Sequence, residues 1–394
     1  MRILMVTSFP IPGEYDGTAM LPIKITRALR ARGIEVQIAY LTARRPWFRG
    51  ISQSDFEGTT IHEIPLALWA SGRGIDRVAR AFPFDLVHAQ HYGGATRAYP
   101  ACRRHRWPIV YEIHSLLGDE VERDSLGRGL IFRGYLELEK RVLRHAAAVI
   151  VLGEPVKSVV VSEKGVPADR VQVIYPGIDL AEFDRPLPEV KIPGISAEDR
   201  VVMYIGSIVH PNQGVPILID ALPCVFDANP QARCVLVGGP AEAGVEYQAR
   251  LGPLGERLIV LTGQTPDQVV ALARRADVLV HPRLACRENY SVQSKIAVYL
   301  AAGRPIVATD FGDYQALLGE SGAGLLSAPA PRPLAQAILE VLANPNLAAR
   351  LASKTGPIAR EFFAMDRNID RYLDVYRQAI ERGPRTTHLD ATLP

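Results

Sequence analysis

The chain has 394 residues, which is too long for a single small module and fits two domains that can each bury a core. Hydrophobic residues make up 48% of it and charged residues 22%, an ordinary globular balance that excludes a disordered or fibrous protein. Lys and Arg outnumber Asp and Glu by only 45 to 42, so a nucleic-acid backbone is a poor candidate for the main partner.

The first half of the chain alternates short apolar runs with helical stretches. Residues 2–7 (RILMVT) form a continuous apolar run that is typical of a buried parallel strand, and residues 21–33 have helical spacing that ends at Gly33. Further strand-like runs follow at residues 35–41, 59–64, 85–89, 108–114, 147–153 and 171–175, with a helical stretch at 129–146. Strands that alternate with helices predict βαβ units and a parallel sheet.

The pattern breaks between Pro176 and Asp199, where four prolines lie in a stretch without periodicity, and it then restarts. Strand-like runs follow at residues 201–207, 232–239, 258–263, 277–283 and 304–310, and helical ones at 214–226, 246–252, 267–276, 291–303 and 368–383. The sequence therefore predicts an α/β protein with two Rossmann-like, doubly wound lobes that face a central cleft.

We expect five segments. They are an N-terminal Rossmann-like lobe at 1–180, a Pro-rich linker at 181–199, a C-terminal Rossmann-like lobe at 200–365, a C-terminal helix at 366–382 and a disordered tail at 383–394. The four cysteines have no zinc-like spacing and indicate reduced thiols. Because no apolar run is long enough for a membrane span or a signal peptide, we expect a cytoplasmic location, dissolved or peripheral on the inner face of the membrane.

Three strand ends of the second half carry small or polar residues, and these are the first candidates for a ligand site. They are Gly206-Ser207, Gly238-Gly239 and Pro282-Arg283. Glycine there lets a phosphate or a nucleotide ring approach the backbone, although tight βα turns are the alternative. No G-x-G-x-x-G follows the first strand, and the chain has no P-loop, H-E-x-x-H or G-x-S-x-G motif. The sequence therefore lacks the usual signals of a dehydrogenase, a P-loop enzyme, a zinc hydrolase and a serine hydrolase.

Residues 294–312 (SKIAVYLAAGRPIVATDFG) resemble the signature of the retaining glycosyltransferases of family 4, and residues 204–222 are similar to the family segment after the linker. Residues 10–17 (PIPGEYDG), 84–91 (FDLVHAQH), 108–115 (PIVYEIHS) and 171–179 (VQVIYPGID) also fall where the family has comparable segments. The resemblance runs from Met1 to about Ile380. It implies the GT-B fold and sugar transfer from a nucleotide sugar.

The resemblance also implies roles for single positions. Gly13 and Gly17 would approach the donor phosphates and the acceptor from the first lobe. His114 matches a family histidine at the sugar-transfer site, with a histidine that only binds a loop carbonyl as the alternative. On the second lobe, Gly206 and Gly214 would shape the phosphate loop, and Gly238 and Gly239 would lie near the base. The donor sugar and phosphates would face a segment that contains Glu288, Asn289, Tyr290, Ser291 and Lys295.

The chain departs from the family at the positions that usually hold the donor. The family's phosphate-binding Arg and Lys correspond to Ser207 and Gln213. The loss of these two cations would remove charge-assisted hydrogen bonds to the donor pyrophosphate, each worth about 1.5 to 3 kcal/mol. Arg283, Arg287 and Lys295 are candidates to replace them, with an ordinary charged rim as the alternative.

The family's two glutamates are also missing. Their positions hold Tyr290 and Val298, the second of which would otherwise bind the ribose. Glu288 is the nearest carboxylate, and we expect it at the donor sugar unless it is a solvated loop acid.

The resemblance implies no cofactor and no metal, with a nucleotide-diphosphate sugar as the donor substrate. The leaving diphosphate would help to deprotonate the acceptor, while the enzyme positions both partners. The acceptor is open among glycans, lipids and metabolites. Basic-aromatic clusters at 44–49 and 103–107 suggest a lipid-linked acceptor and contact with an anionic membrane, with solvated loops and tucked aromatics as the alternative.

Three hypotheses follow. The first is a retaining glycosyltransferase. The second is a degenerate GT-B protein that serves as a non-catalytic sugar-nucleotide-binding or partner subunit, which the missing cations and glutamate suggest. The third, a sugar-nucleotide epimerase of the same architecture, is disfavoured because the matching segments resemble transferases.

Overall fold

The computed structural model describes residues 1–11, 17–42, 50–65, 68, 72–116, 130–284 and 291–383. Contacts between Cα atoms divide the chain into two compact units. Unit 1 combines Met1–Gly177 with Met365–Pro394, and unit 2 is Ile178–Ala364. Residues 181–199, which the sequence suggests as a linker, therefore belong to unit 2, and the last helix belongs to unit 1.

Unit 1 is built on an eight-stranded sheet with the order β3-β4-β2-β1-β5-β6-β7-β8. Its strands are β1 (Arg2–Thr7), β2 (Glu35–Thr42), β3 (Ser52–Phe56), β4 (Thr59–Pro65), β5 (Leu86–Gln90), β6 (Ile109–Ile113), β7 (Ala148–Val151) and β8 (Val171–Val173). All neighbouring strands pair in parallel except β3, which is antiparallel to β4 at the edge. Ile3 to Val6 of the central β1 are buried, because helices cover both faces of the sheet.

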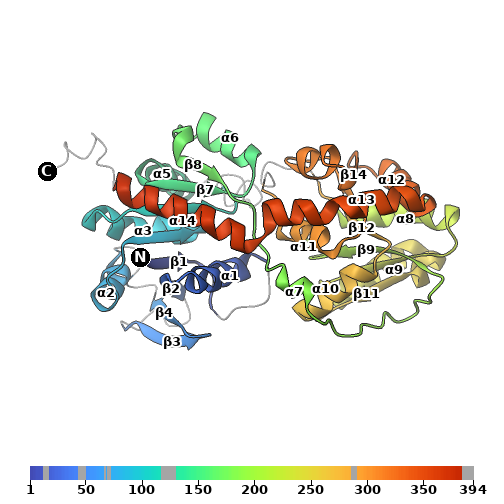
Figure 1. Cartoon of the computed structure of the whole chain (residues 1–394), viewed down its shortest axis with the longest axis horizontal. Coiled ribbons are helices and arrows are strands. Elements are labelled where there is room, and N and C mark those ends of the chain that lie inside the picture. Colours follow the sequence, from blue (N-terminus) through green and yellow to red (C-terminus); the bar gives the residue numbers. More distant parts are fainter. Residues whose placement is uncertain are drawn as a thin grey trace. The chain divides into compact units, whose positions relative to one another are not determined.

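Helices cover the two faces of the unit 1 sheet. They are α1 (Gly17–Ala31), α2 (Arg73–Ala81), α3 (His91–His105), α5 (Leu130–His145), α6 (Glu154–Ser162) and α14 (Met365–Arg382). Helix α3 packs against α5 on one face, whereas α14 packs against α1, β5, β6 and β7 on the other. Figure 1 shows α14 in red, lying along the blue and green elements of unit 1 although it is the last helix of the chain.

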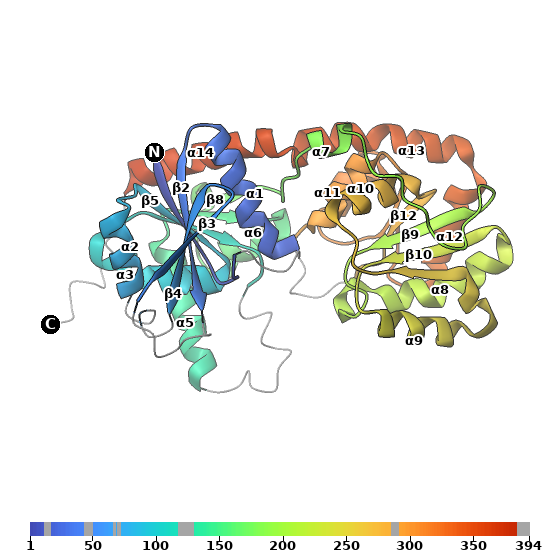
Figure 2. The ribbon, with the colours of Figure 1, turned by 90° about the horizontal axis from the view of Figure 1, so that it is seen from below.

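Unit 2 contains a six-stranded parallel sheet with the order β11-β10-β9-β12-β13-β14. Its strands are β9 (Arg200–Ile205), β10 (Ala232–Val237), β11 (Leu258–Leu261), β12 (Val278–His281), β13 (Ile306–Thr309) and β14 (Gly324–Ser327). Its α-helices are α7 (Ala181–Asp184), α8 (Val215–Ala228), α9 (Ala241–Leu251), α10 (Pro266–Arg275), α11 (Ser294–Ala302), α12 (Pro331–Ala343) and α13 (Pro345–Ile358). Helix α8 packs on α12 and α9, and α11 packs on α10 and α13 (Figure 2).

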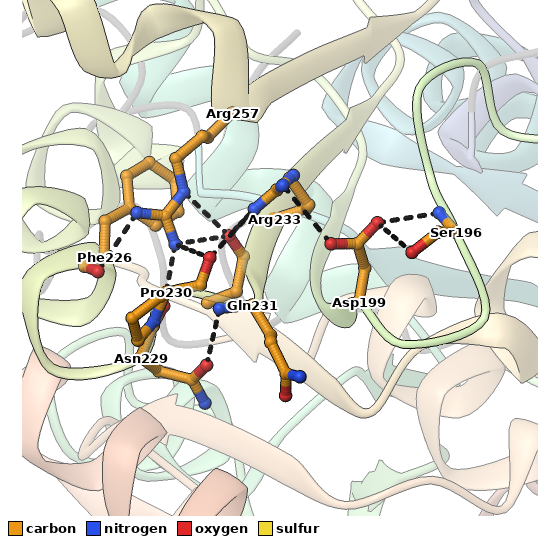
Figure 3. Close-up of polar contacts among 9 residues, drawn as sticks. Ser196, Asp199, Phe226, Asn229, Pro230, Gln231, Arg233 and Arg257 are labelled. Carbon is orange, nitrogen blue, oxygen red and sulfur yellow. Dashed lines mark hydrogen bonds and ion pairs between the residues drawn. The ribbon is translucent and has the colours of Figure 1, made fainter.

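Arg257, at the end of the 3₁₀ turn Gly252–Arg257, binds the corner of unit 2 where α8 ends and β10 begins. Its guanidinium donates to the carbonyls of Phe226, Asn229, Pro230 and Ala232 at 2.7 to 3.1 Å and lies 4.1 Å from the centre of the Phe226 ring (Figure 3). The carbonyls at the end of a helix lack intrahelical partners and favour a cation. Arg257 therefore stabilises the end of α8 and the turn into β10.

The prediction of two Rossmann-like doubly wound units is confirmed. In unit 2 the chain runs through the sheet in the order 3-2-1-4-5-6, which is the doubly wound order, and the parallel strands of unit 1 follow the same rule. The sequence analysis does not predict β3, since the side chains of Ser52 to Asp55 are exposed and give no apolar signal. It also does not predict β14, α12 and α13.

Candidate functional site

The loops at the carboxyl ends of β9 and β10 carry the predicted glycines of unit 2, and Gly214 approaches the loop after β12. Gly206 has φ of 134° and Gly238 has φ of 121°, and a Cβ on Gly238 would lie 2.6 Å from the Gly206 carbonyl oxygen. A Cβ on Gly214, where φ is 68°, would lie 1.7 Å from the carbonyl oxygen of Pro282. These glycines are thus required for the loops to pack against one another, a local reason that the sequence could not supply.

The amide groups of two of these glycines already have partners. Gly206 donates to Val237 and Gly238 donates to Leu261, each at 2.8 Å. A Cβ on Gly239 would lie 2.4 Å from Cγ1 of Ile208. Their contact with a donor nucleotide stays a prediction, and it would have to use other atoms than the Gly206 and Gly238 amides.

Four residues from distant parts of the chain form what we call the cation cluster: Tyr204, Gln213, Arg283 and Lys295. The Lys295 ammonium donates to Oε1 of Gln213 at 2.6 Å and to the Tyr204 hydroxyl at 2.8 Å, and it lies 4.4 Å from the centre of the Tyr204 ring. The Tyr204 hydroxyl in turn contacts the Ser207 carbonyl at 2.8 Å. A Cβ on Gly206 would lie 2.5 Å from Lys295 Nζ, so this glycine makes room for the ammonium.

The cation cluster places positive charge beside Ser207 and Gln213, the uncharged residues that stand at the family's two cationic positions. Gln213 stands where the family has Lys, and it receives the Lys295 ammonium from α11 instead. Arg283, directly after β12, is only 3% exposed, and its guanidinium lies 5.9 Å from the Phe311 ring centre. Leu284 donates its amide to the Asn212 carbonyl, which ties the loop after β12 to the turn that carries Gln213.

Burial makes these charges costly in the structure as it stands. Burial and then the charge of Arg283 hold the pKa of Lys295 well below its ordinary value. Burial, Lys295 and Arg283 likewise hold the pKa of His281 well below its ordinary value, and its Nε2 lies 3.0 Å from the Tyr314 hydroxyl. A bound anion would relieve both costs, because a nearby negative charge favours the protonated forms. The cluster is therefore chemically suited to phosphate.

Helix α11 positions Lys295. Tyr299 lies one turn further along the same face, where its hydroxyl accepts the Ile205 amide at 2.8 Å and donates to the Val280 carbonyl at 3.3 Å. These bonds join α11 to the ends of β9 and β12. Val298 and Ser291 are both partly exposed, and no contact in the structure tests their predicted role toward the nucleotide.

Several predicted residues lie outside the described part of the chain. They are Gly13, Arg287, Glu288, Asn289 and Tyr290, together with the basic-aromatic cluster at 44–49. Gly17 is the first residue of α1. The predicted roles of these residues stay predictions.

The carboxyl ends of β5 and β6 bring further polar residues together in unit 1. His114 follows β6, and its ring centre lies 6.2 Å from that of His91, which follows β5. His91 has φ of 61°, an uncommon conformation for a residue with a side chain, and its Nε2 lies 3.0 Å from the Ser115 hydroxyl. Gln90 is fully buried, and neither polar atom of its amide has a partner among the described residues.

Sequence reasoning identified His114 but missed Gln90 and His91. The signal available was the polar ending of an otherwise apolar strand, in VHAQH at residues 87–91.

The second basic-aromatic cluster, residues 103–107, is held by contacts within unit 1. Arg104 and His105 pair with Asp76 at 2.5 and 3.1 Å. Trp107 packs edge-on against Phe84, with ring centres 4.7 Å apart. Residues 103–105 are the last turn of α3 rather than a loop, and contact of this cluster with an anionic membrane stays a prediction. No helix among the described residues is long and apolar enough to cross a membrane.

The described ranges contain no group of three or more His, Cys, Asp or Glu side chains that could hold a metal ion.

Comparison with known proteins gives two family matches that together span most of the chain. Residues 15–182 match the model of glycosyltransferase family 4, and residues 199–344 match the model of glycosyl transferases group 1. Among curated proteins, the chain is 27% identical to a D-inositol 3-phosphate glycosyltransferase of Nocardioides, with 94% of this chain and 87% of that protein covered. It is 26% identical to the protein of the same name from Rhodococcus jostii, with 96% and 89% covered.

Solved structures show the same fold at low sequence identity. Sucrose-phosphate synthase from Thermosynechococcus elongatus superposes with a TM-score of 0.74 at 18% identity, covering 97% of this chain and 99% of that one. Anabaena HepE in complex with UDP superposes with a TM-score of 0.72 at 21% identity, covering 96% and 100%.

Proposed function

We propose that this chain, which belongs to the family 4 glycosyltransferases of the GT-B fold, transfers a sugar with retention from a nucleotide-diphosphate sugar and without a metal ion. The observation that carries the proposal is the cation cluster at the strand ends of unit 2. Two cations, the buried Arg283 and the partly exposed Lys295, lie beside the glycine loops that the family resemblance assigns to the donor phosphates. They supply charge that Ser207 and Gln213 do not.

The geometry supports binding of the diphosphate by a relocated cation. An ammonium has three donors, and two of those of Lys295 reach Gln213 and Tyr204 in this structure. Gln213 and Tyr204 thus hold the ammonium in place, and a phosphate oxygen would take up its remaining donor. The resemblance assigns the donor sugar to the segment that contains Glu288, and a role in sugar transfer to His114.

Catalysis would depend on positioning and charge stabilisation. The diphosphate leaves the anomeric carbon as the acceptor oxygen attacks the same face, and the leaving oxygen takes the acceptor's proton. Lys295 and Arg283 would stabilise the negative charge that develops on the departing diphosphate.

The relatives suggest which substrates to test first. HepE is described with UDP and with UDP-glucose, so UDP-sugars are the first donors. The curated relatives are named for D-inositol 3-phosphate, so a phosphorylated polyol is the first acceptor. A lipid-linked acceptor at a membrane surface is the next class.

The test is a transfer assay with the purified chain. The protein is incubated in EDTA with UDP-glucose, UDP-N-acetylglucosamine or GDP-mannose, with and without D-inositol 3-phosphate. Release of nucleoside diphosphate and the anomeric configuration of the product by NMR are measured. We expect product with the donor's anomeric configuration. Inverted product contradicts retention, and activity that needs an added metal contradicts the metal-free mechanism.

A second candidate is a GT-B subunit that binds a sugar nucleotide but does not turn it over. The apolar Val298, at the position where the family has a ribose-binding glutamate, favours it. Saturable binding of a nucleotide sugar with neither transfer nor hydrolysis would support this candidate over the first.

A further inference from the structure

Five residues of unit 1 form a buried polar group that we call the histidine cluster: His88, Glu112, His114, Tyr372 and Tyr376. Strand β5 supplies His88, β6 supplies Glu112 and the residue after its end, and α14 supplies the two tyrosines. Glu112 and His88 are fully buried. Tyr372 lies 260 positions from Glu112 in the sequence, so the first and last parts of the chain meet here.

Both carboxylate oxygens of Glu112 are occupied. Oε1 lies 3.2 Å from Nε2 of His114, and Oε2 lies 2.9 Å from Nε2 of His88. Tyr372 donates its hydroxyl to Oε2 at 3.2 Å. An ionised carboxylate only accepts, so the two partners that are hydrogen-bonded to it, His114 and Tyr372, have to present a hydrogen to it.

The contact with Glu112 fixes how His114 carries its proton. An ionised carboxylate has to receive a hydrogen, and the ring atom of His114 that faces Oε1 is Nε2, so the His114 proton lies on Nε2. The second histidine, His88, contacts the Tyr376 hydroxyl through its Nδ1 at 2.8 Å. Neutral His114 then has no proton on Nδ1, and Nδ1 is its acceptor atom.

We propose that Glu112 is a positioning residue, which orients His114 with its proton on Nε2 and its lone pair on Nδ1, and that Tyr372 of α14 holds Glu112 in place. A buried carboxylate that binds one ring nitrogen fixes the tautomer and makes the other nitrogen more basic. The role in transfer rests on the proposed function, whereas the tautomer does not.

The charge of Glu112 is the feature that a merely structural residue would lack. Burial alone would raise the pKa of Glu112, but the hydrogen bonds and charges of His114 and His88 outweigh it and lower the pKa to about 2. Burial and the negative charge of Glu112 raise the pKa of Tyr372 well above its ordinary value, so Tyr372 stays a donor. Taking a buried ion pair out of water is costly, and well-packed apolar residues often replace such pairs without loss of stability.

The chain offers a matched control on the same strand. Tyr111 is also fully buried, and its hydroxyl donates to the buried Glu139 of α5 at 3.3 Å. Successive residues of a strand point to opposite faces, so Tyr111 and Glu112 lie on different sides of the sheet. Tyr111→Phe therefore removes a buried tyrosine–carboxylate bond without touching the histidine cluster.

The test is NMR of the full chain labelled with ¹⁵N-histidine, with the His114 signals assigned from His114→Asn. We expect His114 to have its proton on Nε2 and an unprotonated Nδ1 in the unmodified protein and in Tyr111→Phe. In Glu112→Gln, whose amide presents a donor as well as an acceptor, we expect a mixture of tautomers. A proton on Nδ1 in the unmodified protein, or an unchanged tautomer in Glu112→Gln, overturns the proposal.

Kinetics supply the second readout. We expect Glu112→Gln to lower kcat about 10- to 100-fold with little change in the donor KM. We expect Tyr372→Phe, which keeps the carboxylate, to lower kcat by a smaller factor, and Tyr111→Phe to leave it unchanged. Equal losses in Tyr372→Phe and Tyr111→Phe contradict positioning. If the unmodified chain transfers no sugar, the proposed function fails and the tautomer alone decides this inference.

Discussion

Replacing Lys295 with methionine tests two effects of its ammonium separately: the cost to the stability of the protein and the contribution to donor binding. Methionine keeps most of the length of the side chain and removes the ammonium that donates to Gln213 and Tyr204. One charge-assisted contact to the donor diphosphate is worth about 1.5 to 3 kcal/mol. The dissociation constant for a nucleotide sugar should therefore rise by about 10- to 150-fold.

The stability of the protein, measured without a donor, should rise or stay unchanged in Lys295→Met, although its affinity for the donor falls. The depressed pKa of Lys295 means that its ammonium is held at a cost in the unliganded protein. A folded pKa below the unfolded value makes the unfolded chain bind more protons in the window between the two, so stability rises with pH there. We expect the unmodified protein to gain stability as the pH rises toward 10.5, and we expect Lys295→Met to lack that gain.

Isothermal titration calorimetry with the donor and thermal unfolding from pH 7 to 10 measure the two effects. Lys354→Met, which removes an exposed lysine from α13, is the control. A donor affinity in Lys295→Met equal to that of Lys354→Met refutes the assignment of Lys295 to the diphosphate. A large fall in the melting temperature at pH 7 refutes the claim that the ammonium is costly without an anion.

Three further predictions concern single sites. Gly214→Ala and Gly263→Ala both place a side chain at φ of 68°, but only at Gly214 would the new Cβ meet a carbonyl oxygen, at 1.7 Å. Gly263→Ala should cost roughly 1 to 2 kcal/mol of backbone strain, and Gly214→Ala should destabilise the protein by well over that amount. Equal melting temperatures would contradict the close approach of the loops. Arg257→Met should lower the free energy of unfolding in urea titrations by about 2 to 4 kcal/mol. The control Arg250→Met breaks an exposed ion pair and should cost less than about 1 kcal/mol. Similar losses in the two variants would contradict the role of Arg257 at the end of α8. The lowered pKa of Glu112 contributes about 3 kcal/mol of stability, which is present above pH 4.5 and is lost as the pH falls toward 2. The free energy of urea unfolding should therefore differ less between pH 3 and pH 6 in Glu112→Gln than in the unmodified protein.

The fold was predictable where the sequence carries an apolar pattern. The buried β1 reads as a continuous apolar run because both faces of its sheet are covered, and the repeat of such runs predicts the two doubly wound units. The exposed β3 has no such pattern. The apolar face of α14 indicates that the helix packs on something, but the sequence does not say that its partner is the sheet of unit 1.

The candidate site was predictable by position but not by contact. The sequence suggests Lys295 as a replacement cation, yet only the structure shows that Gln213 receives it across 82 positions of the chain. His114 follows from its place after a strand. Glu112, two residues earlier, lies within the buried run IVYEI, and a carboxylate there was the unused signal of the histidine cluster.

Binding of a nucleotide-diphosphate sugar to unit 2 through the cation cluster can be measured by thermal unfolding of the chain in EDTA. The ligands are uridine, guanosine, adenosine and thymidine diphosphates and their common sugar conjugates. A ligand at a hundredfold excess over its dissociation constant stabilises by about 2.7 kcal/mol, which corresponds to a shift of several degrees. We expect such a shift with one nucleotide, and we expect Lys295→Met to lose it. No shift with any of these ligands would show that the cation cluster does not bind a nucleotide-diphosphate sugar.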